Sequence, residues 1–165
     1  MADSQTNRDE SEKERLDRNL LELLNELRVA LPGVQVLFAF LLTVPFTQRF
    51  TTLTPTQERI YYTTLLLTTA SSVLLFAPTA HHRINFRRKD KAYIVSLANK
   101  LAIAGLAFLA LAMSGVVYLI TDLLYGSTAT AVATAGALIA FGFLWYAVPL
   151  WRRMRRGVDT PDTLT

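Results

Sequence analysis

The chain has 165 residues, of which 52% are hydrophobic and 18% are charged, and its formal net charge is +4. This length suits one compact unit, and the absence of cysteine excludes disulfides, thiolate nucleophiles and cysteine metal sites. Residues 1–28 hold eight of the thirteen acidic residues, whereas long stretches after Arg28 carry no charge of either sign. This asymmetry predicts a polar N-terminal region followed by a membrane-embedded domain.

The N-terminal region divides into two predicted parts. Residues 1–10 are polar and lack apolar periodicity, which predicts a disordered tail. Residues 11–28 predict a cytoplasmic amphipathic helix, with Ser11 as N-cap and Glu14 as its capping-box partner. Leucines recur at helical spacing along it and just beyond it, and they form one stripe: Leu16, Leu20, Leu23, Leu24, Leu27 and Leu31. This stripe either lies at the membrane surface or against the inner ends of the bundle, or it docks to a partner or a second copy.

Four segments then meet the requirement of about 20 mostly apolar residues for crossing a membrane. The predicted spans are approximately 29–48, 60–80, 101–121 and 129–150. We therefore predict an all-α fold, a four-helix transmembrane bundle over residues 29–151 with the N-terminal amphipathic helix on its cytoplasmic side. Residues 152–165 form a basic and then polar tail, which we also place in the cytoplasm.

The orientation follows from the distribution of Lys and Arg. The N-terminal region, the loop between the second and third spans and the C-terminal tail together carry fifteen of these residues, and the other two loops carry two. Because basic residues are retained in the cytoplasm, both termini and the middle loop are predicted to be cytoplasmic. The basic middle loop is also expected to attract anionic lipid headgroups.

Small residues and prolines suggest how the spans pack. The third span offers Ala102, Gly105 and Ala112, and the fourth offers several alanines and Gly136. Since small residues permit close helix approach in lipid, we expect these two spans to form a tight hairpin, although the same pattern suits an oligomer face. Pro32 and Gly33 are expected to bend the chain ahead of the first span.

Polar residues near the spans are the candidate functional residues. Gln35 is the best candidate for a buried polar group and is expected to bond to another helix. His81 and His82 lie at the inner end of the second span, where they are expected either to pack at the membrane interface or to handle a proton or a metal ion. The basic loop that begins at Arg83 is expected to pair with Glu22 and Glu26 of the N-terminal helix. The hydroxyl groups of the second span can bond to their own helix or to a neighbour: Thr63, Thr64, Thr68, Thr69, Ser71 and Ser72.

Motifs that carry catalysis are missing from the sequence. It holds no Ser/His/Asp set, HExxH, P-loop or GxGxxG, and no Asp, Glu, Lys or Arg lies well inside a span. We therefore predict a protein that is not an enzyme, has no cofactor or metal, and does not bind nucleic acid, because membrane topology accounts for its basic charge. Its predicted role is interaction, through a homo-oligomer or a membrane-protein partner, and the alternative is antiporter-like transport of a small cation or proton.

Several short motifs resemble a family of small, uncharacterised four-helix membrane proteins of bacteria, mainly actinobacteria. The resemblance covers roughly residues 16–155. It rests on the following matches: Glu26–Val29, Gly33–Gln35, Phe38–Leu41, Pro45–Phe46, Arg49–Phe50, Ala77–Pro78, His82–Arg83 and Phe86. It implies a bacterial plasma membrane location and marks five residues as motif positions: Glu26, Arg28, Gln35, His82 and Arg83.

Overall fold

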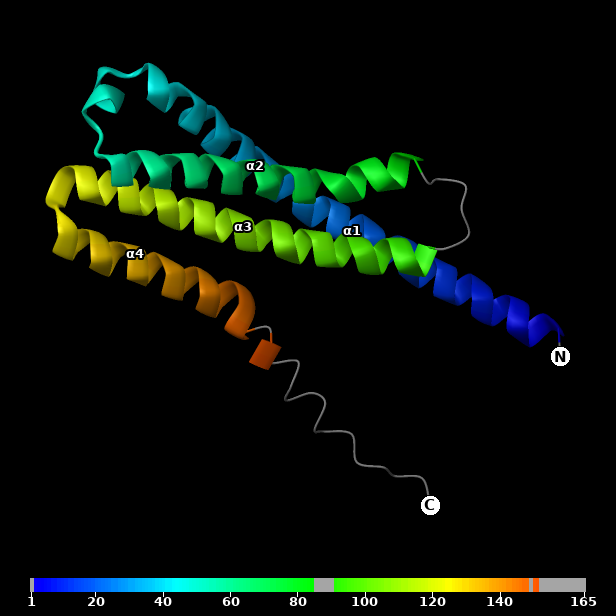
Figure 1. The fold of residues 1–165 in the computed structure, drawn as a ribbon. Coiled ribbons are helices and arrows are strands. Elements are labelled where there is room, and N and C mark those ends of the chain that lie inside the picture. The colour runs from blue at the N-terminus through cyan, green and yellow to red at the C-terminus, as the bar shows by residue number, and fades with distance from the viewer. Residues whose placement is uncertain (1, 85–90, 149, 152–165) are drawn as a thin grey trace. The chain divides into compact units, whose positions relative to one another are not determined.

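The computed structural model describes residues 2–84, 91–148 and 150–151, without the side chains of residues 2–13, 16–17, 81–84 and 91–92. Within these ranges the chain is helical and has no strand. The four long helices are α1 (Ala2–Thr43), α2 (Pro55–Ile84), α3 (Lys91–Tyr125) and α4 (Ser127–Gly142) (Figure 1). Short helical segments follow α1 and α4: η1 (Val44–Phe46), η2 (Gln48–Thr52) and the π-helical η3 (Phe143–Ala147).

The four helices are long and apolar enough to cross a membrane, which confirms the predicted fold class. The qualifying segments contain the second and third predicted spans and most of the first and fourth: Arg18–Phe46, Pro55–Ala80, Tyr93–Tyr125 and Ser127–Ala147. Three of the helices exceed the length that a membrane requires. The 42 residues of α1 extend about 63 Å at the α-helical rise, which is about twice the thickness of a hydrocarbon core.

The structure differs from the prediction at the start of the chain. Residues 2–10 are helical, Ser11 lies inside α1 and does not cap it, and no separate helix over residues 11–28 is present. The helix also continues through Pro32, where a bend was expected. Pro32 is exposed, so its ring has room on the outer face of the helix. The leucines on the other face are held in a core, and this packing outweighs the single backbone hydrogen bond that a proline removes.

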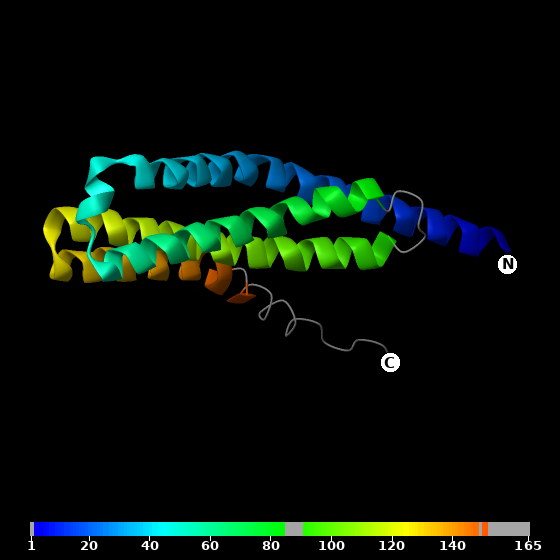
Figure 2. The ribbon, with the colours of Figure 1, turned by 45° about the horizontal axis from the view of Figure 1, so that its top comes forward.

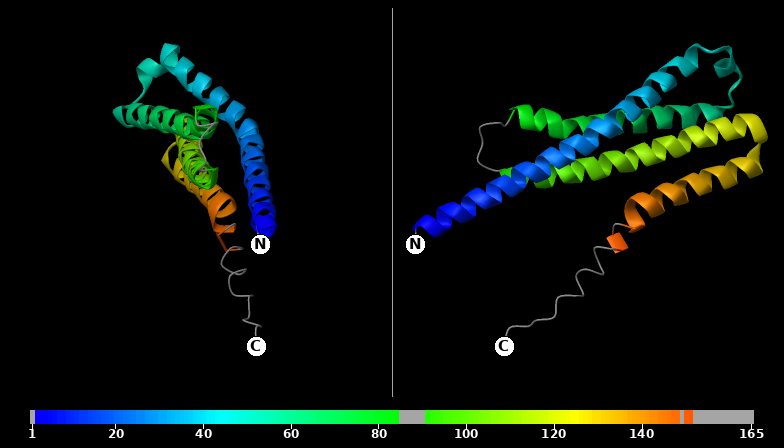
Figure 3. Two further views of the ribbon diagram at one scale, coloured as in Figure 1. Left: turned by 90° about the vertical axis from the view of Figure 1, so that its right-hand side faces the viewer. Right: turned by 180° about the vertical axis from the view of Figure 1, so that it is seen from behind.

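The chain forms two compact units, Met1–Leu109 and Ala110–Thr165, and the boundary between them lies within α3. In the first unit α2 runs antiparallel to the first half of α3, while α1 crosses them obliquely and its N-terminal end projects beyond them (Figures 2 and 3). The buried residues Leu27, Val34 and Leu41 recur every seven positions along α1 and therefore share one face.

This face of α1 builds the core of the first unit. Leu27 and Val34 cluster with Leu75 of α2 and with Ala102 and Leu109 of α3. Partly buried leucines complete the cluster: Leu23, Leu31, Leu37 and Leu106. Leu23 and Leu27 of the predicted leucine stripe therefore pack within the core of the first unit.

Helices α2 and α3 approach each other closely at Gly105. A Cβ atom on Gly105 would stand 2.7 Å from Cγ of Leu75 and 3.3 Å from Cβ of Leu74. The Ser71 hydroxyl donates a hydrogen bond of 2.8 Å to the Gly105 carbonyl across the same contact. Gly105 was expected to serve a contact with the fourth span or an oligomer face, whereas its missing side chain serves the contact with α2.

In the second unit the C-terminal half of α3 returns into α4 through Gly126 (Figure 1). This residue has a φ of +80°, a conformation that only glycine adopts at low cost. A Cβ atom on Gly136 or Gly142 of α4 would meet no atom within 4 Å. These two glycines therefore mark no close contact of the predicted hairpin.

Replacing Gly105 by Ala should destabilise the fold, because the new methyl group collides with the fully buried Leu75. We expect a loss of about 1–3 kcal/mol, as for other overpacked sites, and a lower midpoint of thermal unfolding in detergent. The matched control is Gly136→Ala, which adds the same methyl group to open space within a helix. Equal midpoints for the two variants would contradict this description of the contact.

Candidate functional site: a row of buried hydroxyl groups on α2

One face of α2 carries four buried hydroxyl groups, which we call the hydroxyl row. Its members are Tyr61, Thr64, Thr68 and Ser71, and their exposed fractions are 5%, 1%, 0% and 0%. Their alternating spacing of three and four residues places them on one side of the helix. The row ends beside Leu75, so it continues the apolar face that joins the core of the first unit.

Each hydroxyl of the row donates to a backbone carbonyl oxygen. Thr64 donates to Ile60 over 2.7 Å, and Thr68 donates to Thr64 over 2.8 Å, both within α2. Ser71 bonds across to Gly105 of α3, as described above, and Tyr61 bonds across to α1. All four donors are therefore satisfied without water, which is the condition for burying a hydroxyl group at low cost.

The hydrogen bond from Tyr61 to α1 supplies a donor to a carbonyl oxygen that lacks its usual partner within α1. Its hydroxyl donates to the Leu41 carbonyl oxygen over 2.8 Å. In a continuing helix that oxygen would accept from the N–H of residue 45, but residue 45 is proline and has none. Tyr61 thus replaces the missing backbone donor at the end of α1. The Phe50 ring of η2 packs edge-on against the Tyr61 ring, with the ring centroids 5.3 Å apart.

A capping box starts α2 and thereby fixes where the hydroxyl row begins. The Thr54 hydroxyl accepts a hydrogen bond from the Gln57 N–H over 3.3 Å, and the Gln57 side-chain oxygen accepts from the Thr54 N–H over 2.9 Å. Pro55 occupies the first helical position, where its missing N–H costs nothing. The pattern Thr-Pro-Thr-Gln at residues 54–57 is a helix-start signal that could have been recognised in the sequence.

The predicted site residues lie apart from the hydroxyl row. Glu22, Glu26 and Arg28 are exposed on α1. Gln35 is exposed as well, so the expectation that it is buried in the bundle is wrong. It follows Val34 by one residue, and the helical turn of 100° per residue carries it off the buried face.

Two other predictions concern residues at the end of α2. His81, His82 and Arg83 lie in its last turn, but their side chains are outside the described part of the chain. The expected pairing of the basic loop with Glu22 and Glu26 involves residues 85–90, which are also outside it. Among the described side chains no group of three or more His, Asp or Glu residues could hold a metal ion.

Where the structure describes it, the chain has four helices that are long and apolar enough to cross a membrane. The four hydroxyl groups of the row are bonded to backbone carbonyls in its interior. Residues 9–149 match a family of unknown function, DUF6328. The chain therefore belongs to this family, as the resemblance in the sequence indicated. It matches no curated protein and no solved structure.

Replacing Tyr61 by Phe should leave the Leu41 carbonyl without a donor. An unsatisfied buried carbonyl costs about 1–3 kcal/mol, and we expect thermal stability in detergent to fall accordingly. Tyr62→Phe is the matched control, because Tyr62 is 60% exposed and its hydroxyl is not needed for packing.

A second background tests the role of Pro45. Pro45→Ala restores an N–H that can supply the Leu41 carbonyl, so Tyr61→Phe should cost less in that background than in the wild-type chain. An equal loss in both backgrounds would show that Tyr61 stabilises the fold by packing alone.

Proposed function

We propose that this chain is a multi-pass protein of a bacterial plasma membrane that acts through protein interaction and is not an enzyme. One observation carries the proposal: the buried hydroxyl groups of the row already have hydrogen-bond partners within the chain, whereas the polar motif residues on α1 are exposed and accessible to a partner. The hydroxyl groups of the row are bonded to backbone carbonyls of the same chain. The motif residues whose side chains are described, Glu26, Arg28 and Gln35, are exposed on α1.

Exposed apolar side chains support placement in a membrane. On α1 the exposed fractions of Val29, Val36 and Phe40 are 80%, 70% and 54%. A contiguous apolar surface of this kind is unfavourable in water, whereas lipid tails cover it without cost. Further exposed apolar residues lie on α2, α3 and α4, including Val73, Leu111 and Ile139.

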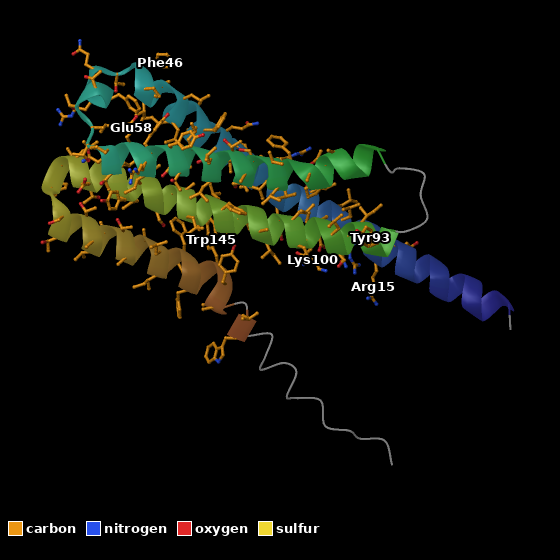
Figure 4. All side chains as sticks on the ribbon, in the orientation of Figure 1. Arg15, Phe46, Glu58, Tyr93, Lys100 and Trp145 are labelled. Atoms are coloured by element: carbon orange, nitrogen blue, oxygen red, sulfur yellow. The ribbon has the colours of Figure 1, made fainter. Side chains whose placement is uncertain are left out.

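The positions of charged residues support the proposed orientation. In Figure 4, Arg15 and Lys100 lie towards the end of the first unit where α3 begins, whereas Phe46 and Glu58 lie towards the opposite end. The end near Lys100 is the one that the distribution of basic residues assigns to the cytoplasm. Both chain termini and the loop between α2 and α3 are cytoplasmic in this orientation.

Reporter fusions test the membrane proposal. A green fluorescent protein fused after Thr165 should fluoresce, and alkaline phosphatase fused there should be inactive, because the first folds in the cytoplasm and the second requires an oxidising compartment. A phosphatase inserted after Thr52, in the loop between α1 and α2, should be active. Recovery of the chain in the soluble fraction, or the reverse reporter pattern, would overturn the proposed placement.

Ion flux distinguishes interaction from transport. Purified protein in liposomes that carry a pH-sensitive dye should not accelerate sodium- or potassium-dependent proton movement beyond that of protein-free liposomes. The expectation rests on the occupied hydroxyl groups of α2 and on the lack of a charged residue well inside a span. Flux that scales with protein and is lost in His82→Ala, but kept in Thr79→Ala, would replace interaction by transport.

A further inference from the structure

Gln35 is a polar side chain in an unfavourable place. It lies within the charge-free stretch 29–48, seven residues beyond Arg28, which corresponds to about 10 Å along the helix axis. It is exposed on the surface of the first unit. If the chain spans a membrane as proposed, this depth lies inside the hydrocarbon region, where no water is available to the amide.

The amide of Gln35 therefore requires a partner. A glutamine side chain offers two donor hydrogens and an acceptor oxygen with two lone pairs. No side-chain hydrogen bond to Gln35 is present within the described part of the chain. An amide left unpaired in an apolar medium costs free energy that an interhelical hydrogen bond recovers in part.

The surroundings of Gln35 suit the approach of another helix. Arg28 lies seven residues before it, and Leu42 lies seven residues after it. Each of these three residues directly follows a buried residue of α1, namely Leu27, Val34 or Leu41. Arg28, Gln35 and Leu42 therefore form an exposed row beside the buried face of α1. Ala39, one turn beyond Gln35, is also exposed and small enough to admit a close backbone contact.

We propose that a second copy of this chain covers this row, with the two Gln35 amides hydrogen-bonded to each other across a two-fold axis. This inference rests on the proposed membrane placement and names the partner. Two copies inserted with the same orientation are related by an axis along the membrane normal, so residues near that axis face their own counterparts. An amide is complementary to itself, since its donor side meets the acceptor side of an identical group.

The flanking residues are compatible with this pairing. Arg28 lies near the headgroup level, where its long side chain turns towards water and lipid phosphate, so the two guanidinium groups need not meet. Leu42 contributes apolar contact at the other end of the row. A single polar residue within an otherwise apolar helix contact fixes register and the number of copies, as buried asparagine does in coiled coils.

Disulfide cross-linking tests the proposal directly, because the natural chain has no cysteine and each introduced one is unique. Leu42→Cys places a thiol on the proposed row and keeps Gln35. Phe40→Cys is the matched control, since it lies two residues away on nearly the opposite side of α1 and is 54% exposed. Under mild oxidation in native membranes we expect a disulfide-linked dimer from Leu42→Cys and little from Phe40→Cys.

A second substitution tests the role of the amide. Adding Gln35→Leu to Leu42→Cys should slow dimer formation about fivefold or more, because the hydrogen bond between the two amides is lost. Leucine favours insertion, so this change does not impair the span. Gln48→Leu is the control, because Gln48 is exposed in η2 outside the span and should leave the rate unchanged.

The outcomes separate this inference from the proposed function. Equal cross-linking of Leu42→Cys and Phe40→Cys, absence of a dimer from either, or an unchanged rate with Gln35→Leu would overturn the pairing through Gln35. The same membranes are washed with alkaline carbonate before oxidation. If the chain leaves the membrane in that wash, the proposed membrane placement fails as well; if it stays, only the dimer contact fails.

Discussion

A backbone carbonyl oxygen inside an apolar helix has no water to bond, and Pro45 creates such an oxygen at Leu41. The Tyr61 hydroxyl of α2, twenty residues later in the sequence, donates a hydrogen bond to this oxygen. The bond ties the end of α1 to the start of α2, and the capping box of Thr54 and Gln57 sets the rotation of α2 that makes the bond reachable. The same rotation directs Thr64, Thr68 and Ser71 into the interior of the chain.

The hydroxyl row shows how polar residues can be buried with their donors satisfied by backbone carbonyls. Two of its hydroxyl groups bond within α2, and two bond to neighbouring helices. The internal bonds make α2 behave as an apolar surface, whereas the external ones fix its position against α1 and α3. The Ser71 bond is possible only because Gly105 has no side chain and lets the two backbones come close. Polar composition in this helix therefore serves packing.

The outer surface of α1 has a different character. Its buried face is apolar and repeats every seven residues, and a second row that contains Arg28, Gln35 and Leu42 lies beside it on the exposed side. A helix that is about twice as long as a membrane is thick can hold the bundle together on one face and present polar groups on another. The proposed role in protein interaction would use this surface.

The sequence by itself determined the four apolar helices, because an uncharged run of about 20 residues has few other stable states. It also determined the absence of known catalytic motifs, which depends only on residue types and spacing. The tertiary structure alone decided that α1 continues through Pro32, since the leucine packing that holds it comes from other helices. It likewise decided that Gln35 faces outwards. Val34 and Gln35 have the same apolar neighbours in the sequence, and only their positions around the helix axis decide which of them is buried. The donor for the Leu41 carbonyl could not be predicted from the sequence for the same reason. A proline shows which carbonyl oxygen lacks its helical donor, and only the arrangement of the helices shows that the Tyr61 hydroxyl replaces it.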